Sequence, residues 1–172
     1  MKSTIQDKAK LVNSVFSRVY DKYDLMNDIM SLGIHRIWKD KFIDWMNPSR
    51  SSTMIDVASG TGDIAKLFSL RVKNLSMVTC IEPNEDMFRK GKNNLINFKN
   101  IKWIKSRAET LPVEDNTYDF YSISFGIRNV SDINKTLKEA LRVLKPGGRF
   151  MCLEFSKIEN ELINYMYKNY SK

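Results

Sequence analysis

The stretch that decides the fold is Met54-Ile-Asp-Val-Ala-Ser-Gly-Thr-Gly-Asp63, in which apolar residues run into a cluster of small ones. A helix-like apolar pattern follows at once, over residues 64–68. This order predicts a buried strand, a tight glycine loop and the first turn of a helix. Because Gly60 and Gly62 carry no Cβ, a ligand can approach the main chain of such a loop closely. The sequence therefore predicts a binding loop here.

An acidic residue follows this loop at an informative distance. Glu82 lies twenty residues after Gly62, at the end of a second predicted strand over residues 77–81. A carboxylate at this spacing can accept hydrogen bonds from the hydroxyl groups of a ribose. Glu82 is therefore a candidate binding residue for a nucleotide-like ligand.

The rest of the chain alternates strands with helices. Further strands are predicted over residues 101–105, 118–125 and 149–155, and further helices over 34–46, from residue 85 and over 133–144. Lys145-Pro-Gly-Gly148 is a strong signal for the end of the last helix. The pattern predicts one α/β domain with a doubly wound, mostly parallel sheet over residues 53–156. An N-terminal helical cap over residues 1–48 and a short tail over 157–172 complete the prediction.

The predicted helix over residues 34–46 has an apolar face, formed by Ile34, Trp38, Phe42, Trp45 and Met46. Its charged residues, Lys39 among them, fall mostly off this face. The simpler interpretation is that the helix caps the domain, and the alternative is that its two tryptophans rest on a membrane interface.

Composition excludes several classes of protein. The 172 residues contain 42% hydrophobic residues and no apolar run of the ~18 residues that a membrane span needs. The N-terminus has no secretory signal, so we expect a cytoplasmic protein. A single histidine and no C-x-x-C motif predict that no Cys/His zinc site exists. The net charge of +8 comes from lysines spread along the chain, so we do not expect a nucleic-acid partner.

Two kinds of ligand fit the glycine loop. The spacing Gly60-x-Gly62-x-x-Ala65 matches the dinucleotide fingerprint, so an NAD(P)-dependent oxidoreductase is one alternative. The carboxylates of Asp56 and Asp63, however, would repel a pyrophosphate. They suit a ligand that lacks a phosphate but carries an adenosine and a positively charged amino-acid end. S-adenosylmethionine has this chemistry.

The loop resembles the first motif of class I S-adenosylmethionine-dependent methyltransferases, which implies a Rossmann-like fold. Other segments closely resemble the UbiE-type C-methyltransferases of quinone biosynthesis: Lys22-Tyr-Asp-Leu-Met-Asn-Asp28, Met30-Ser-Leu-Gly-Ile-His-Arg36, Trp38-Lys39, Ser124-Phe-Gly-Ile-Arg-Asn-Val130 and Leu144-Lys-Pro-Gly-Gly148. The resemblance implies methylation of a ring carbon in a polyprenylated benzoquinol or naphthoquinol, with S-adenosylmethionine as methyl donor and no metal.

The resemblance also implies roles for individual residues. Those expected to bind the cofactor are Asp56, Gly60, Thr61, Gly62, Glu82, Arg107, Ala108 and Ser124. Family members usually have Asp at the position of Glu82 and a small polar residue at that of Arg107.

Three residues are candidates for the chemistry. Arg128 is expected to stabilise a phenolate, Asn129 to orient a ring oxygen and Tyr23 to form part of the substrate wall. The alternative for Asn129 is a cap of the helix that follows it.

Family members continue past the fifth strand into a closing β-hairpin, which we expect to be missing from this chain. A truncated, inactive or scaffolding member of the family is therefore an alternative to an active enzyme. The prenyl tail of the substrate implies contact with the inner face of the membrane. A homodimer or a quinone-biosynthesis complex is a further expectation.

Overall fold

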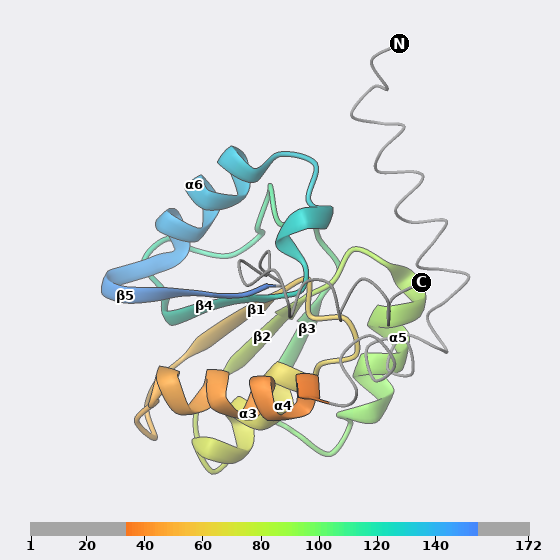
Figure 1. Ribbon diagram of the computed structural model, residues 1–172, viewed down its shortest axis with the longest axis vertical. Coiled ribbons are helices and arrows are strands. Elements are labelled where there is room, and N and C mark those ends of the chain that lie inside the picture. The colour runs from red at the N-terminus through yellow and green to blue at the C-terminus, as the bar shows by residue number, and fades with distance from the viewer. Residues whose placement is uncertain (1–33, 155–172) are drawn as a thin grey trace, which may run out of the picture.

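The computed structural model describes residues 34–154 as a parallel sheet with helices on both faces (Figure 1). The sheet has five strands in the order β3-β2-β1-β4-β5, and every neighbouring pair is parallel. The strands are β1 (Met54–Val57), β2 (Val78–Ile81), β3 (Ile101–Ile104), β4 (Tyr118–Ser124) and β5 (Leu144–Leu153). The helices are α3 (Ile34–Met46), α4 (Asp63–Arg71), α5 (Glu85–Asn94), the short 3-10 helix η2 (Ile127–Asn129) and α6 (Ile133–Val143). The predicted doubly wound α/β fold is confirmed.

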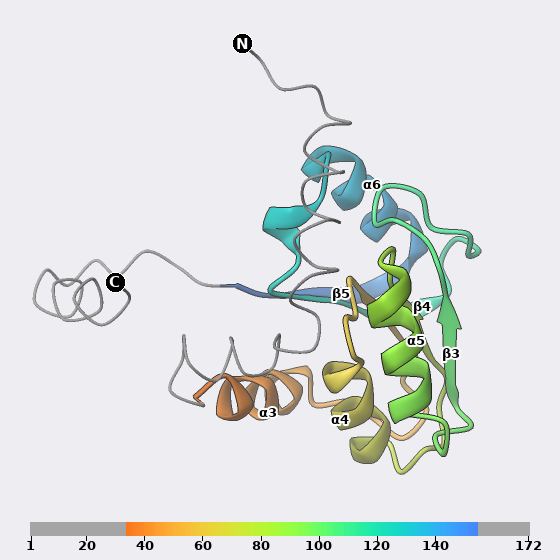
Figure 2. The same cartoon turned by 90° about the vertical axis from the view of Figure 1, so that its right-hand side faces the viewer.

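Each face of the sheet has its own hydrophobic core. Figures 1 and 2 show α3 and α4 on one face and α6 on the other. The side chain of Met54 belongs to the core under α3 and α4, whereas those of Ile55 and Val57 belong to the core on the α6 face. Because both faces are covered, all four residues of β1 are buried, and the strand reads as an apolar run rather than an alternating one.

The strand order creates a switch point between β1 and β4. The chain runs outward from β1 through β2 to β3 and then returns to pair β4 with the other side of β1. Val57 lies opposite Ile123 in this pairing, so the loops that follow the two strands begin side by side. Ligands of doubly wound sheets bind at such a point, outside the carboxyl ends of the strands.

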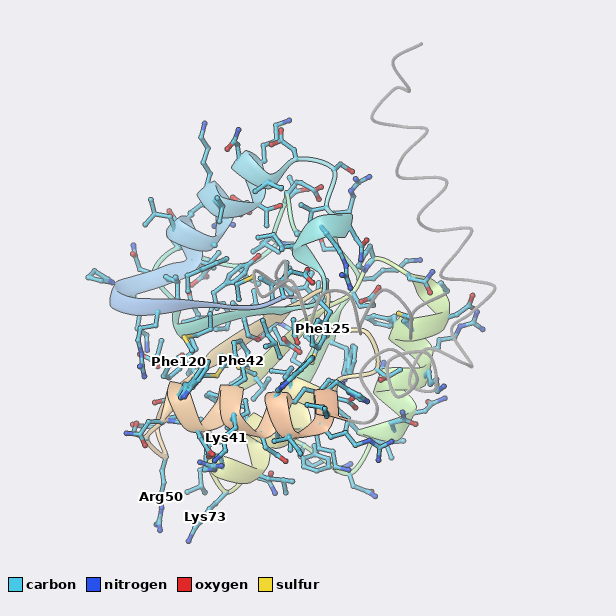
Figure 3. All side chains as sticks on the ribbon, viewed as in Figure 1. Lys41, Phe42, Arg50, Lys73, Phe120 and Phe125 are labelled. Carbon is cyan, nitrogen blue, oxygen red and sulfur yellow. The ribbon has the colours of Figure 1, made fainter. Side chains whose placement is uncertain are left out.

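Helix α3 is buried along a different face from the predicted one. Phe42 and Met46 are buried as expected, and Phe42 lies between the helix and the sheet (Figure 3). Ile34, Trp38 and Trp45, however, are exposed, Trp45 to 72%. Lys39, predicted off the apolar face, is buried. The reason is that α3 packs against α4 as well as the sheet, and this neighbour covers the side of the helix on which Lys39 lies.

Helix α6 also leaves much of its apolar pattern uncovered. Its buried residues are Thr136, Ala140 and Val143, whereas Ile133, Leu137 and Leu141 are exposed. The helix follows β4 and lies over β5, the last strand at this edge of the described sheet. The sheet therefore covers only one side of α6.

Residues 145–148, predicted to end the last helix, lie inside the strand that directly follows it. Helix α6 ends at Val143 and β5 begins at Leu144. The register of β5 against β4 shifts between Tyr118 and Phe120, where Leu144 and Arg149 are the respective partners. Lys145-Pro-Gly-Gly148 thus forms an irregularity in the edge strand, where a proline is tolerated.

Gly91 provides a test of the packing between α5 and β3. A Cβ at this position would lie 2.2 Å from Cη2 of Trp103. We expect Gly91→Ala to lower the free energy of unfolding by about 1–3 kcal/mol, because the indole must move within a packed core. Urea denaturation measures this change. Lys92→Ala, at an exposed position of the same helix, should leave stability nearly unchanged, and equal stability of the two variants would contradict the packing.

Candidate cofactor site

The glycine loop adopts backbone conformations that only glycine readily accepts. Gly60 has φ +56° and Gly62 has φ +88°. A Cβ on Gly62 would also lie 2.6 Å from Cδ1 of Leu95. The hydroxyl group of Ser59 donates a hydrogen bond to the carbonyl oxygen of Asp56 at 2.7 Å and so ties the loop to β1. The predicted sequence of strand, tight loop and helix N-terminus is confirmed.

Glu82 holds this loop from the adjacent strand. Its carboxylate accepts one hydrogen bond from the backbone N–H of Gly60 at 2.8 Å and another from that of Asn84 at 2.9 Å. Burial raises the pKa of Glu82 above its ordinary value, and the two backbone donors oppose that shift. A carboxylate has about four lone-pair sites, so Glu82 retains capacity to accept ribose hydroxyl groups, the role that the sequence predicts.

A cleft open to solvent lies at the switch point between β1 and β4. The empty space in this cleft, open solvent included, is about 410 Å³. The residues that line it come from α3, from β1 and the loop after it, from the start of α4, and from the end of β4: Lys39, Asp56, Ala58, Ser59, Gly60, Thr61, Asp63, Ile64, Ser124 and Phe125. Four of the eight residues predicted to bind the cofactor line the cleft: Asp56, Gly60, Thr61 and Ser124. Glu82 holds the loop from outside the lining.

Two buried polar atoms at the cleft have no hydrogen-bond partner within residues 34–154. They are Oδ2 of Asp56 and Oγ of Ser124. The other carboxylate oxygen of Asp56 accepts a hydrogen bond from the hydroxyl group of Ser122 at 2.6 Å. Burial raises the pKa of Asp56 to about 7. Unsatisfied buried atoms of this kind are rare, and an ammonium-bearing ligand would satisfy both the charge and the hydrogen-bonding capacity of Asp56.

A lysine that the sequence did not single out also lines the cleft. The ammonium group of Lys39 lies 2.6 Å from Oδ2 of Asp63. The side chain of Lys39 is 10% exposed and that of Asp63 is 47% exposed. In the sequence, only the Trp38-Lys39 pair, one of the segments that resemble the family, pointed to Lys39. The helical pattern placed Lys39 off the apolar face and so did not indicate that this residue is buried.

Four of the eight predicted cofactor residues lie outside the lining of this cleft: Gly62, Glu82, Arg107 and Ala108. Gly62 and Glu82 belong to the glycine loop or hold it, whereas the other two lie elsewhere. The guanidinium group of Arg107 is hydrogen-bonded to Ser131 and lies 3.5 Å from a carboxylate oxygen of Glu109. Ala108 is buried in the core on the α6 face. The contact of Arg107 and Ala108 with the cofactor stays a prediction.

Two of the three candidates for the chemistry, Arg128 and Asn129, lie in η2, which follows β4. Nη1 of Arg128 lies 3.2 Å from Oε1 of Glu154. The alternative interpretation of Asn129 as a helix cap is wrong, because Asp132 is the N-cap of α6 and accepts a hydrogen bond from the backbone N–H of Lys135 at 3.0 Å. Tyr23 lies outside the described residues. The roles of all three candidates stay predictions.

Within the described range 34–154, no group of three potential metal ligands occurs. None of the helices in that range is long and apolar enough to cross a membrane.

Comparison with known proteins decides the family. Residues 2–172 match the model of the ubiE/COQ5 methyltransferase family. The chain belongs to this family. A Rickettsia bellii protein named ubiquinone/menaquinone biosynthesis C-methyltransferase UbiE is 54% identical over 172 residues, which are 96% of this chain and 68% of the relative. A Rickettsia prowazekii protein of the same name is 52% identical over 171 residues, with 95% and 68% covered.

Solved structures agree with the family's fold. A methyltransferase from Aquifex aeolicus superposes with a TM-score of 0.61 at 23% identity and covers 93% of this chain and 77% of its own. A methyltransferase from Thermotoga maritima superposes with a TM-score of 0.65 at 22% identity, with 92% and 68% covered. As a member of the ubiE/COQ5 family, this protein is a methyltransferase whose methyl donor is S-adenosylmethionine. The alternative of an NAD(P)-dependent oxidoreductase is therefore rejected.

The raised pKa of Asp56 makes a prediction about stability. The folded-state pKa is about 7, whereas the ordinary value is 3.8, so the folded state binds more protons between these pH values. Asp56 therefore lowers stability as pH rises from about 4 to about 7. Asp56→Asn should remove this loss, which amounts to at most about 4 kcal/mol. Urea denaturation at pH 5 and pH 8 measures the part of this loss that falls between those pH values, about 3 kcal/mol. An equal pH dependence in both proteins would show that Asp56 does not titrate in this window.

Proposed function

We propose that this protein methylates a ring carbon of a polyprenylated benzoquinol or naphthoquinol, in the biosynthesis of ubiquinone or menaquinone. The observation that carries the proposal is 54% identity, over 96% of the chain, to a protein whose name states that activity. The cleft supports it, because its carboxylates suit a sulfonium cofactor with an amino-acid end.

The residues around the cleft have distinct tasks in binding the cofactor. S-adenosylmethionine supplies an electrophilic methyl group on a positively charged sulfur. Asp56, with Oδ2 available, is suited to the ammonium group of the cofactor, and Glu82 to the ribose hydroxyl groups. The unsatisfied hydroxyl group of Ser124 is a further polar contact at the end of β4. Fixing the cofactor in this way aligns the reacting atoms, which lowers the entropic part of the barrier.

Arg128 is proposed to activate the substrate. The ring carbon becomes nucleophilic when the neighbouring hydroxyl group loses its proton, and a fixed cation stabilises the resulting phenolate. An arginine is a poor base because its pKa exceeds ~12, so its role is electrostatic. The ion pair with Glu154 at 3.2 Å supports this role, because it restrains the guanidinium group beside the ends of β4 and β5. Asn129 is proposed to orient a ring oxygen and Tyr23 to contact the ring.

Contact with a membrane is proposed from the exposed side of α3. Ile37, Trp38 and Trp45 are large apolar side chains that are exposed on this helix. Tryptophan is favoured at membrane–water interfaces, and a prenylated substrate resides in the membrane. A cytoplasmic location with contact at the inner face is the corresponding proposal, and a homodimer or a larger complex stays a prediction.

A non-catalytic role in a quinone-biosynthesis complex is the alternative. Transfer of a labelled methyl group from S-adenosylmethionine to a demethylquinol separates the two. Labelled methylquinol supports the enzyme, whereas cofactor binding without any transfer supports the scaffold.

The role of Arg128 is tested by Arg128→Ala. We expect turnover to fall by about 100-fold or more, because a preorganised charge is lost, while the dissociation constant for S-adenosylmethionine changes by less than about threefold. Methyl-transfer assays and calorimetry measure the two quantities. Arg89→Ala, at an exposed position on α5 that forms comparable ion pairs, is the matched control. Full turnover in Arg128→Ala would rule out the phenolate role.

The membrane proposal is tested by Trp45→Ser. We expect the substitution to weaken binding to anionic phospholipid vesicles about fivefold or more, because an exposed indole no longer enters the interface. Leu75→Ser, which replaces an exposed apolar residue beyond the end of α4, should leave binding unchanged. Cosedimentation with vesicles gives both affinities, and equal binding by the two variants would refute a role for this side of α3.

A further inference from the structure

Lys39 is a buried charge at the cleft that the proposed function does not yet use. It is 8% exposed and lies on α3, outside the glycine loop and the strand ends that form the rest of the lining. Burying a lysine costs free energy unless its charge is paired, so its position calls for a physical reason. The ion pair with Asp63 offsets only part of the free energy that burial of Lys39 costs, because the carboxylate of Asp63 is half-exposed to solvent.

Helix α3 holds Lys39 in a defined place. Phe42, Ile43 and Met46 anchor the helix in the core under the sheet. The guanidinium group of Arg149 on β5 donates a hydrogen bond to the carbonyl oxygen of Met46 at the end of the helix. Arg71 on α4 reaches Asp44 at 2.6 Å. These contacts fix α3 against both α4 and the sheet, and the ammonium group of Lys39 is therefore positioned rather than mobile.

The charges around the cleft are arranged as a complement to an amino acid. Asp56 offers an unsatisfied carboxylate oxygen, which suits an ammonium group. Lys39 is the only cation among the lining residues of the described chain. It lies close enough to Asp56 for its charge to oppose, in small part, the rise that burial causes in the pKa of that carboxyl. An ammonium group has three donors, and Asp63 takes one of them.

We propose that Lys39 binds the carboxylate group of the methionine end of S-adenosylmethionine, with Asp63 holding the lysine in position. The inference rests on the proposed use of this cleft for the cofactor. Asp56 and Lys39 then recognise the two opposite charges of one zwitterion. The pair also rejects ligands that carry an ammonium group without a carboxylate, because these leave Lys39 facing a positive charge.

The test compares two ligands that differ only in this carboxylate. Decarboxylated S-adenosylmethionine keeps the adenosine, the sulfonium and the ammonium group. Calorimetry of the full chain should give at least tenfold tighter binding of S-adenosylmethionine. In Lys39→Met the affinity for S-adenosylmethionine should fall by about 10- to 100-fold, the usual effect of losing a charge-assisted hydrogen bond. The affinity for the decarboxylated ligand should stay the same or rise, because a repulsive charge is removed.

Matched variants separate this role from a structural one. Lys41→Met removes a lysine whose side chain is 66% exposed on the same helix (Figure 3), and it should change neither affinity. Lys39→Gln can still donate a hydrogen bond to Asp63 and repeats the test if Lys39→Met does not fold, which circular dichroism reveals. Equal weakening of both ligands, or no weakening of either, would overturn the assignment. Failure of the unsubstituted chain to bind S-adenosylmethionine at all would instead contradict the proposed function and the inference with it.

Discussion

The parallel pairing of β1 with β4 is the constraint on which the site depends. Asp56 and Ser122 are partners in this pairing and are joined by a hydrogen bond of 2.6 Å between their side chains. The pairing brings the loop after β1, which carries the glycines, beside Ser124 and Phe125 at the end of β4. Neither loop forms a cleft alone. Because β2 and β3 occupy the other side of β1, the two loops diverge from a common origin and leave space between them.

The site contains buried charged groups, and hydrogen bonds and ion pairs within the protein offset only part of the free energy that their burial costs. Glu82 accepts two backbone hydrogen bonds, and Lys39 is paired with Asp63. Asp56 has one hydrogen bond and one unsatisfied oxygen, and its pKa is raised to about 7. Such a carboxylate is stabilised by any cation that enters the cleft. Binding a ligand with an ammonium group would therefore lower the pKa of Asp56, and the free energy stored in its burial would contribute to ligand affinity.

The helix that precedes the sheet covers the core and also contributes to the site. The periodicity of residues 34–46 indicated a helix, which is confirmed. The predicted apolar face was wrong for Ile34, Trp38 and Trp45, which are exposed, and Lys39 is buried instead. A helical pattern assigns residues to a buried or an exposed face by their polarity alone. It therefore cannot predict that a lysine is buried because it pairs with an acidic residue on another helix. The same limit applies to α6, where the exposure of Ile133, Leu137 and Leu141 depends on how far the sheet extends beneath the helix.

The sequence by itself determined the α/β class, the glycine loop and the ligand-binding edge of the sheet. Apolar runs, glycine positions and strand–helix alternation are local signals, and Gly60, Gly62, Asp56 and Glu82 lie within or next to them. Only the tertiary structure decided which distant side chains meet: Lys39 with Asp63 across 24 residues, Arg128 with Glu154 at the ends of β4 and β5, and Arg107 with Ser131 away from the lining of the cleft. These contacts are set by the strand order and by the packing of α3 on α4, and the chain carries no local pattern for either.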